Sequence, residues 1–259
     1  MQDRLIREPR FSLAEIDTTV PTYERFKWPK PVPSLSPLQK FIADDFMQYW
    51  HGVLPQRYGL VETFNHTYPL RHLPQGQTWR TLELGAGIGA HLAFERLDTQ
   101  DYHCIELRES MAEVIRQRFP TATTVTGDCQ KRIPYDDAHF DRVVVIHVLE
   151  HLPDLPMAVA EVERVLKPGG IFSVVFPCDP GLAYEIARKI SAERLFKAKY
   201  CIPYGWLIRR EHINSPAEIL YLIGKRFDII DKSYFPLHIP IVNLNLCIGL
   251  TARKPAREN

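Results

Sequence analysis

The stretch that decides the fold is Thr81-Leu-Glu-Leu-Gly-Ala-Gly-Ile-Gly-Ala90. Apolar residues lead into three glycines at every second position, Gly85, Gly87 and Gly89, and an acid, Glu83, stands two residues before the first. Glycine lets a strand turn sharply into a helix and lets the backbone approach a ligand closely. A helix that starts here offers free N–H groups to a polar or anionic group. The stretch therefore predicts a site for a nucleotide-like cofactor.

The glycines alone fit more than one interpretation. Gly85, Gly87 and Ala90 satisfy G-x-G-x-x-A, a variant of the dinucleotide-binding fingerprint, and a tight structural turn is a further alternative. The carboxylate of Glu83 would repel a pyrophosphate, whereas it would attract the ammonium and sulfonium groups of S-adenosylmethionine. The acid therefore favours S-adenosylmethionine over a dinucleotide.

Strand and helix patterns alternate on both sides of the glycines. The predicted strands are 80–84, 102–107, 123–126, 140–147 and 171–176, and the predicted helices are 90–97, 110–118 and 155–166. A turn at Lys167-Pro-Gly-Gly170 separates the last of these helices from the strand that follows it. A helix from Ser215-Pro216 and a strand pair, 227–234 and 242–251, complete the series. This order predicts an α/β fold with a doubly wound, mostly parallel sheet of seven strands.

Two regions lie outside this regular pattern. Residues 1–35 are rich in proline and charge, which predicts an extended arm, and a helical pattern that starts at Ser36-Pro37 predicts a helical cap. We assign residues 1–70 to this arm and cap and residues 71–259 to the α/β domain. Within the domain we expect an insertion at about 180–212, made of a helix over 181–199 and an irregular aromatic loop over 200–210.

Composition limits the classes of partner. The formal net charge of +1 gives no support for nucleic-acid binding through a basic surface. Five scattered cysteines without a CxxC pair indicate neither a zinc site nor a disulfide framework. The first ten residues lack the apolar run of a signal peptide, and no segment approaches the ~18 apolar residues of a membrane span. We therefore expect a cytoplasmic protein with reduced cysteines.

Polar residues stand at the carboxyl ends of the next predicted strands, the edge at which open α/β sheets bind ligands. Glu106, followed by Leu107, comes about twenty residues after the first glycine, where an acid can accept hydrogen bonds from two ribose hydroxyls. Asp128 can accept a hydrogen bond from an adenine amino group, and the backbone N–H of Cys129 can donate to a ring nitrogen. His147 ends the fourth strand and is predicted to line the same pocket.

Together these segments resemble the class I S-adenosylmethionine-dependent methyltransferases of the small-molecule type. The matching segments are L-E-L-G-A-G-I-G for motif I, I-E-L-R-E-S-M for the second strand end, G-D-C for the adenine-side loop, F-D-R-V-V-V-I-H-V-L-E-H-L for the fourth strand and L-K-P-G-G for the turn after it. The resemblance is close over roughly 75–178 and loose over 213–251. It implies an antiparallel terminal strand pair, S-adenosyl-L-methionine as cofactor, and a cofactor site made of the acids, the glycines and the strand-end residues named above.

Histidines near the fourth strand are the candidates for catalysis. Methyl transfer to an oxygen needs a base for the departing proton, and we predict that His151 or His212 supplies it. The structural alternative is that His151 only bonds the following loop. His147, Glu150 and His151 also have the spacing of an E-x-x-E-H string that holds a divalent metal in some O-methyltransferases. Because a histidine replaces the first acid, we predict no metal ligands.

The resulting prediction is an S-adenosylmethionine-dependent methyltransferase that O-methylates a small molecule or a glycan precursor. A basic run from Arg188 to Lys199 leaves an RNA or protein substrate as an alternative, although we expect no nucleic-acid partner. A further alternative is a cofactor-binding module without catalysis. Tyr200, Tyr204 and Trp206 predict either a flat or apolar substrate face or a loop anchored by its own aromatic residues.

Overall fold

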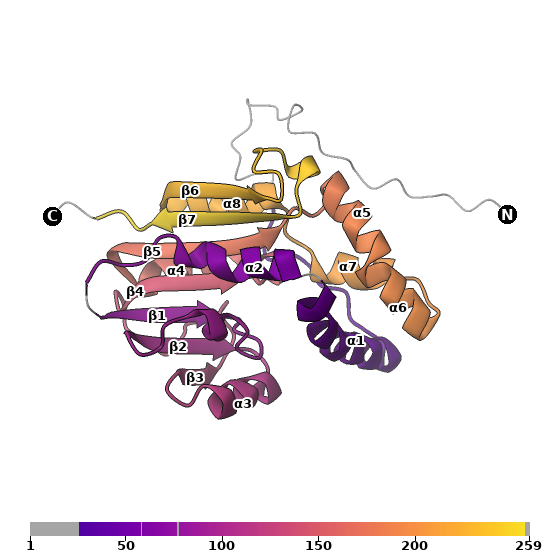
Figure 1. Cartoon of the computed structure of the whole chain (residues 1–259), viewed down its shortest axis with the longest axis horizontal. Coiled ribbons are helices and arrows are strands. Elements are labelled where there is room, and N and C mark those ends of the chain that lie inside the picture. The colour runs from indigo at the N-terminus through magenta and orange to yellow at the C-terminus, as the bar shows by residue number, and fades with distance from the viewer. Residues whose placement is uncertain (1–25, 58, 77, 257–259) are drawn as a thin grey trace.

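A computed structural model describes residues 26–57, 59–76 and 78–256. Seven strands of this part form one sheet in the order β3-β2-β1-β4-β5-β7-β6 (Figure 1). The strands are β1 (Trp79–Leu84), β2 (Gln100–Glu106), β3 (Thr123–Thr126), β4 (Phe140–Ile146), β5 (Leu166–Pro177), β6 (Asp228–Phe235) and β7 (Cys247–Arg253). The first five pair in parallel, whereas β7 is antiparallel to both β5 and β6. The predicted fold class is confirmed, including the antiparallel pair at the end of the sheet.

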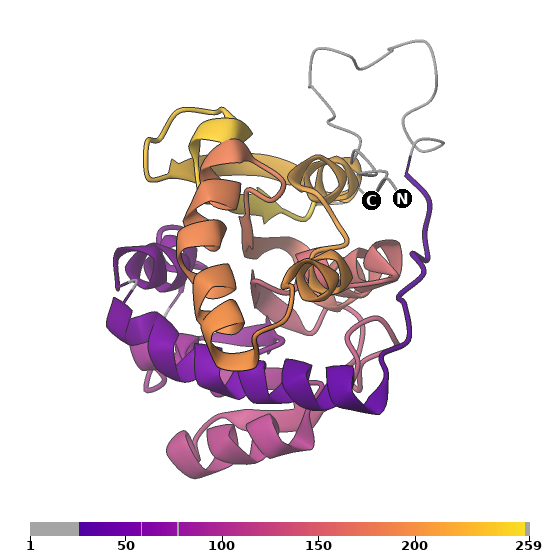
Figure 2. The same cartoon turned by 90° about the vertical axis from the view of Figure 1, so that its right-hand side faces the viewer.

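Helices cover both faces of this sheet. They are α1 (Pro37–Arg57), α2 (Gly59–Thr67), α3 (Glu109–Arg118), α4 (Leu155–Val165), α5 (Leu182–Ile190), α6 (Ala192–Tyr200), α7 (Gly205–Glu211) and α8 (Pro216–Arg226), with the 3-10 helices η3 (Tyr68–Leu70), η4 (His91–Phe94), η5 (Leu149–His151) and η6 (Val242–Leu244). Figure 2 shows α4 and α8 on one side of the sheet and α2 on the other. The helices α5, α6 and α7 gather with α1 beyond the carboxyl ends of the strands (Figure 1).

The hydrophobic core is formed by the apolar residues that recur at strand and helix spacing in the sequence. The run Val143–Val145 in the central strand β4 is fully buried, because helices cover both faces of the sheet there. On α4, Leu155, Val159 and Val162 recur at helical spacing and are also fully buried. Each such side chain contributes about 1.5–3 kcal/mol when it leaves water, so this central layer holds the strand ends firmly in place.

Three predicted element boundaries are wrong in informative ways. The turn predicted at 167–170 belongs to β5, which starts at Leu166. The pairing of β5 with β4 shifts its register between Phe140 and Arg142, and Gly169, with φ +76°, lies in this irregular part of β5. The helix predicted over 90–97 is reduced to η4. The strand predicted from residue 242 begins only at Cys247, because η6 occupies its first residues.

The insertion is more ordered than the sequence indicated. The helix predicted over 181–199 is two helices, α5 and α6, that meet at Ser191, whose ψ of −98° is not helical. The Ser191 hydroxyl donates to the carbonyl of Ala187, a local bond that competes with the helix ladder. The loop predicted over 200–210 contains the helix α7.

Aromatic residues of the insertion hold the helix α1 in place. The ring of Phe196 lies 5.1 Å from that of Phe46 on α1 and 5.1 Å from that of Tyr204, and all three residues are buried. Tyr200 donates a hydrogen bond to Asp45 of α1. This packing favours the interpretation that the aromatic residues anchor the insertion, and it identifies α1 as the predicted helical cap. Of the arm predicted over residues 1–35, residues 1–25 lie outside the described residues, and residues 26–35 form neither helix nor strand.

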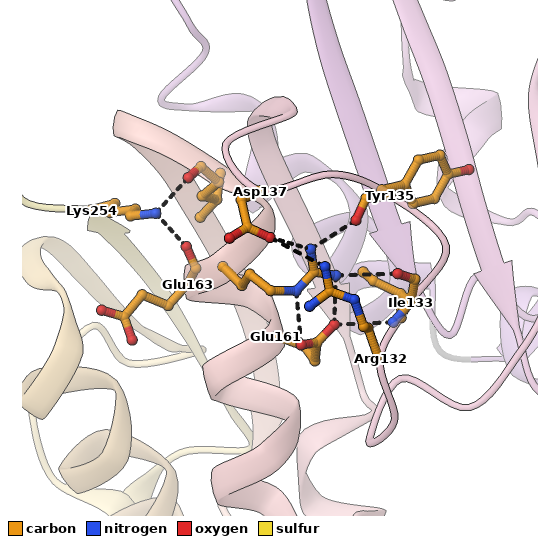
Figure 3. Close-up of polar contacts among 9 residues, drawn as sticks. Arg132, Ile133, Tyr135, Asp137, Glu161, Glu163 and Lys254 are labelled. Carbon is orange, nitrogen blue, oxygen red and sulfur yellow. Dashed lines mark hydrogen bonds and ion pairs between the residues drawn. The ribbon is translucent and has the colours of Figure 1, made fainter.

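A charged network at the C-terminal end of α4 ties this helix to the loop before β4. Arg164 donates hydrogen bonds to the carbonyl oxygens of Ile133 and Tyr135 and to the carboxylates of Asp137 and Glu161. Figure 3 shows these acceptors converging on one point. The network lies at the end of α4 that faces away from the carboxyl edge of the sheet, so it serves the fold.

Candidate functional site

The glycine turn after β1 contains one position that is open to a ligand. Gly87 has φ +57°, and a Cβ atom added there would meet no atom within 4 Å. A Cβ at Gly85 would collide with Val148, and one at Gly89 would lie 2.9 Å from the ring of Phe119. Packing therefore explains the outer two glycines, whereas Gly87 exposes its backbone toward the carboxyl edge of the sheet.

Glu106, at the end of β2, is fixed beside this turn. Its Oε2 accepts a hydrogen bond from the backbone N–H of Gly87 at 2.9 Å, and its Oε1 accepts one from Arg108 at 3.0 Å. The backbone N–H of Gly127 donates to the Glu106 carbonyl and so joins the third strand end to the second. Glu106 is buried, whereas the neighbouring Leu107 is exposed. The carboxylate is therefore positioned in advance for a polar ligand at Gly87.

The third strand end presents polar groups at the same edge. Asp128 accepts hydrogen bonds from the backbone and the side chain of Gln130 through Oδ1. Burial raises the pKa of the Cys129 thiol to about 12, so this side chain is not a reactive thiolate at neutral pH. The predicted role of Cys129 concerns its backbone N–H, which the buried thiol does not affect.

Glu83 lies inside the sheet region and faces away from solvent. Its Oε2 accepts a hydrogen bond from the hydroxyl of Tyr102 at 3.0 Å, and the residue is 3% exposed. Burial raises the pKa of Glu83 to about 8, so the carboxyl is largely protonated at neutral pH. In this arrangement Glu83 braces β1 against β2, and its contact with a cofactor remains a prediction.

A second cluster follows β4 and is centred on Glu150. His147, with φ +51°, donates from Nδ1 to Glu150 Oε1 at 3.1 Å. The other oxygen of Glu150, Oε2, is buried and has no hydrogen-bond partner among the described residues. Although burial opposes ionisation, the nearby His151 and the bond from His147 lower the pKa of Glu150 to about 2. The site therefore holds a buried carboxylate with one unpartnered oxygen.

His151 and His212, distant in the sequence, meet beside this carboxylate. Their ring centroids lie 5.2 Å apart. His151 donates from Nδ1 to the carbonyl of Glu211 at 2.5 Å, and His212 donates from Nδ1 to Asp179 Oδ2 at 2.8 Å. Since both Nδ1 atoms are engaged, Nε2 is the nitrogen that each ring retains for a substrate or an ion. The structure thus brings together the two histidines that the sequence singled out.

The loop before α8 is bonded to η5, and this connection positions His212 opposite His151. The backbone N–H groups of Ile213 and Asn214 donate to the carbonyl of Glu150. The Asn214 side chain donates to two carbonyls of the η5 region and accepts from the indole of Trp28 at 3.1 Å. Sequence reasoning missed Asn214, since nothing local marks it as a connector.

Asp179 is a second residue that sequence reasoning missed. It follows the end of β5 in Cys178-Asp-Pro180, so the general rule that acids at strand ends line sites could have found it. Tyr184, on α5, also reaches this place: its ring centroid lies 5.8 Å from that of His212. The site is therefore bounded by residues of β4, β5 and the insertion.

One set of side chains has the geometry to hold a cation. A carboxylate oxygen of Glu150 and one ring nitrogen each of His151 and His212 all lie within 4.8 Å of one another. His147, which belonged to the spaced string in the sequence, is not part of this set and bonds Glu150 instead. The third member of the set, His212, is brought there by tertiary contact and not by helical spacing along the chain.

Comparison with known proteins agrees with this architecture. Residues 82–174 match the family described as a methyltransferase domain. The sterol 4-C-methyltransferase strm-1 of Caenorhabditis elegans is 30% identical over 163 residues, which are 59% of this chain and 47% of that protein. A probable phthiotriol/phenolphthiotriol dimycocerosates methyltransferase 2 of Mycobacterium ulcerans is 32% identical over 143 residues, 53% of this chain and 54% of that protein. The chain thus spans about half the length of these relatives.

A solved structure shares the fold. A protein of Thermotoga maritima, described as an S-adenosylmethionine-dependent methyltransferase and possible histamine N-methyltransferase, superposes with a TM-score of 0.60 at 18% identity and covers 83% of this chain and 98% of its own. The fold and the glycine turn define a nucleotide-binding α/β protein with a terminal antiparallel strand pair. Residues 82–174 thus match a methyltransferase domain, and the fold of the chain is shared with this solved protein.

The residues at the carboxyl edge fit the cofactor that this family implies, S-adenosyl-L-methionine. The open face of Gly87 admits a ligand next to the backbone, and the fixed carboxylate of Glu106 suits ribose hydroxyls. Asp128 and Cys129 follow β3, whose last residue Thr126 pairs with Glu106, and an adenine ring would lie there. The prediction of the cofactor is confirmed, whereas the contacts of single residues with it remain predictions.

Proposed function

We propose that this protein transfers a methyl group from S-adenosylmethionine to a small, apolar acceptor. The observation that carries the proposal is the pairing of His151 with His212 beside the buried carboxylate of Glu150, at the same sheet edge as Gly87 and Glu106. Two relatives named above carry acceptor names of apolar character, a sterol and dimycocerosates. These names support a lipid-like acceptor over a glycan precursor.

The histidine pair has the properties of a general base. S-adenosylmethionine, when bound, supplies an electrophilic methyl group, and the acceptor then loses a proton. Burial lowers the pKa of His151, which favours the neutral imidazole that can accept this proton at Nε2. The bond to Asp179 fixes the tautomer of His212 in the same sense. We retain an oxygen acceptor as the specific proposal, because a hydroxyl needs such a base, and we place the reaction in the cytoplasm.

A cation site is the second candidate role for the cluster, and the unpartnered Oε2 of Glu150 favours it. An ionised carboxylate and two imidazoles are ligands that divalent transition metals accept, and hydrogen bonds at both Nδ1 atoms would orient the rings. Dialysis against EDTA separates the two roles. A base mechanism keeps turnover within about twofold, whereas a metal mechanism loses more than about tenfold and regains it with added Zn²⁺ or Mn²⁺.

The cofactor claim is tested by isothermal titration with S-adenosylmethionine. Glu106→Ala should weaken binding by about tenfold or more, because charge-assisted hydrogen bonds to the ribose contribute about 1.5–3 kcal/mol. Glu109→Ala is the matched control, since Glu109 is an exposed acid that bonds Arg116 on its own helix. Equal loss in both variants, or no binding to the unaltered protein at millimolar cofactor, would contradict the proposal.

The acceptor class is tested with tritium-labelled S-adenosylmethionine and cell extracts divided into lipid, aqueous, RNA and protein fractions. We expect the label in the lipid fraction, and either an alkali-stable methyl ether or a methyl ester that alkali hydrolyses would establish an oxygen acceptor. A label on carbon would correct the atom, as the sterol 4-C-methyltransferase relative suggests. A label in RNA or protein would replace the proposed acceptor with the alternative from the basic run.

A further inference from the structure

The helix α5 turns its apolar side toward solvent. Leu182, Ile186 and Ile190 follow one another at intervals of four residues and are 57%, 52% and 69% exposed. None of the residues of α5 is buried. An amphipathic helix of a globular protein normally packs such a stripe on the core, so this stripe lacks the cover that its pattern demands within the described residues.

A second apolar segment lies beside α5. The loop between β6 and β7 exposes Leu237, Ile239 and Ile241, and its short helix η6 packs against α5. The two segments approach closely at Gly181, where an added Cβ would lie 2.8 Å from the carbonyl oxygen of Val242. Both views place η6 next to the start of α5 (Figure 1, Figure 2). We call these six side chains of α5 and the loop the apolar face.

In the loop of the apolar face, the polar backbone groups face the protein interior and the apolar side chains are exposed. Asn245, fully buried, accepts a hydrogen bond from the backbone N–H of Leu237 at 2.9 Å. Its amide group donates to the carbonyls of Ile239 and Ile241 at 2.8 and 2.9 Å. The polar backbone thus points inward to one side chain while the apolar side chains point outward. A segment that enters hydrocarbon must satisfy its backbone internally in this manner.

The two segments that carry the apolar face differ in their content of charged residues. Residues 233–252 contain no Asp, Glu, Lys or Arg. The stretch 182–200, which forms α5 and α6, contains five basic and two acidic residues. Its exposed lysines Lys189, Lys197 and Lys199 pair with Glu185, Glu193 and Asp45 of α1, so five positive charges meet three negative ones and the net charge stays positive. A net positive charge beside an apolar surface matches the charge of an anionic bilayer.

We propose that the apolar face docks this protein on the surface of a lipid bilayer. A protein partner would satisfy the apolar side chains equally well, but the inward-facing backbone of the loop and the net positive charge of the stretch 182–200 together favour lipid. None of the described helices is long and apolar enough to cross a membrane. Leu182 and Tyr184 stand on the same helix, and the Tyr184 ring lies near that of His212, so α5 extends from the bilayer contact to the proposed acceptor site.

The route of the acceptor rests on the proposed function, whereas bilayer binding itself does not. The test is therefore co-flotation of the full chain with vesicles, without S-adenosylmethionine. Vesicles of phosphatidylcholine are compared with vesicles that also contain phosphatidylglycerol. We expect binding to both, stronger by about tenfold on the anionic vesicles at low salt. Ile239→Asp combined with Ile186→Asp should reduce binding by about tenfold or more.

Leu60→Asp is the matched control, because Leu60 is 79% exposed but lies on α2 and is not one of the six side chains of the apolar face. It should bind vesicles as the unaltered protein does. A single Leu237→Cys variant labelled with an environment-sensitive dye gives a second measurement that needs no charged substitution, and its emission should shift to the blue on vesicles. Absence of flotation, equal losses in the control, an unshifted dye, or self-association of the chain through this face would overturn the proposal.

Discussion

The two ends of the segment η5–α4 carry charged clusters that differ in how completely their polar atoms are paired. At the far end, Arg164 uses all three guanidinium nitrogens, with both oxygens of Glu161 among its acceptors (Figure 3). At the near end, Oε2 of Glu150 has no hydrogen-bond partner within the described part of the chain. His151 and His212 engage Nδ1 in hydrogen bonds, and Nε2 of His151 lies 3.8 Å from Glu150 Oε1, beyond hydrogen-bond distance. A saturated network stabilises a fold, whereas an unsaturated buried cluster indicates a place for a ligand.

The difference also shows which evidence separates structure from function. Both clusters contain ionised carboxylates and nitrogen donors, so composition alone does not distinguish them. What distinguishes them is the number of acceptor and donor atoms left over after folding. That number depends on residues far apart in the sequence, such as Asp179 and Asn214, which fix the orientation of the rings and loops.

Substitution at the near end should have the largest effect. His151→Ala and His212→Ala should each lower kcat by about 10²–10⁴-fold, because a positioned base contributes this range. The double variant should be no more than severalfold slower than the worse single variant, since residues that act as a unit are not additive. Single-turnover rates with labelled S-adenosylmethionine provide the measurement.

His72→Ala is the control for this cycle, because His72 is partly exposed and pairs with Asp231 outside the site. It should keep the unaltered rate. Strictly multiplicative losses of kcat in the His151 and His212 variants would show that the two rings act independently. Such a result would contradict the description of the near end as one functional cluster.

Substitution at the far end should change stability and leave binding intact. Arg164→Met removes the donor of five hydrogen bonds and leaves Glu161 buried without its cation, which should cost about 3 kcal/mol of unfolding free energy. Urea unfolding measures the loss, and titration with S-adenosylmethionine should give an unchanged Kd. Arg226→Met, which removes a more exposed pair with Glu163, should cost less than about 1 kcal/mol.

Equal costs of Arg164→Met and Arg226→Met would mean that saturation does not stabilise α4. A changed cofactor Kd in Arg164→Met would connect the two ends of the helix and would remove the distinction between them.

Glu83 is a buried acid whose hydrogen-bond partner is a neutral tyrosine rather than a cation, so it should affect the stability of the protein in a pH-dependent way. Its pKa rises from the ordinary 4.5 to about 8 on folding, so the folded state holds a proton that the unfolded state has lost between these values. Stability from this group is therefore present below about pH 4.5 and falls as pH rises toward 8, by up to about 1.4 kcal/mol per pH unit.

Glu83→Gln should keep the contact with Tyr102 and remove this slope. Urea unfolding at pH 5, 6, 7 and 8 compares the two proteins, and the difference between them cancels the titration of histidines elsewhere. Parallel curves would mean that Glu83 is ionised in the folded state and that its burial is compensated by another group.

Local patterns were enough for the parts of the fold that depend on neighbouring residues. The buried run of β4, the helical spacing on α4 and the glycine turn all follow from periods of two and 3.6 residues and from backbone freedom at Gly87. The start of α8 was equally readable, because Ser215 and Glu218 form a capping box. The break at Ser191 was not, since one hydroxyl and the packing of α6 on α1 decide it.

The sequence by itself determined the class of sheet and the places of the glycine turn and Glu106 at the carboxyl ends of β1 and β2, because the order of strands and their carboxyl ends are local properties joined by a general rule of topology. Only the tertiary structure decided that His212 stands beside His151, that Glu83 faces Tyr102, and that the loop around Asn245 turns its apolar side chains outward. These facts depend on contacts between residues that are distant along the chain, and no periodic pattern records which distant residues will meet.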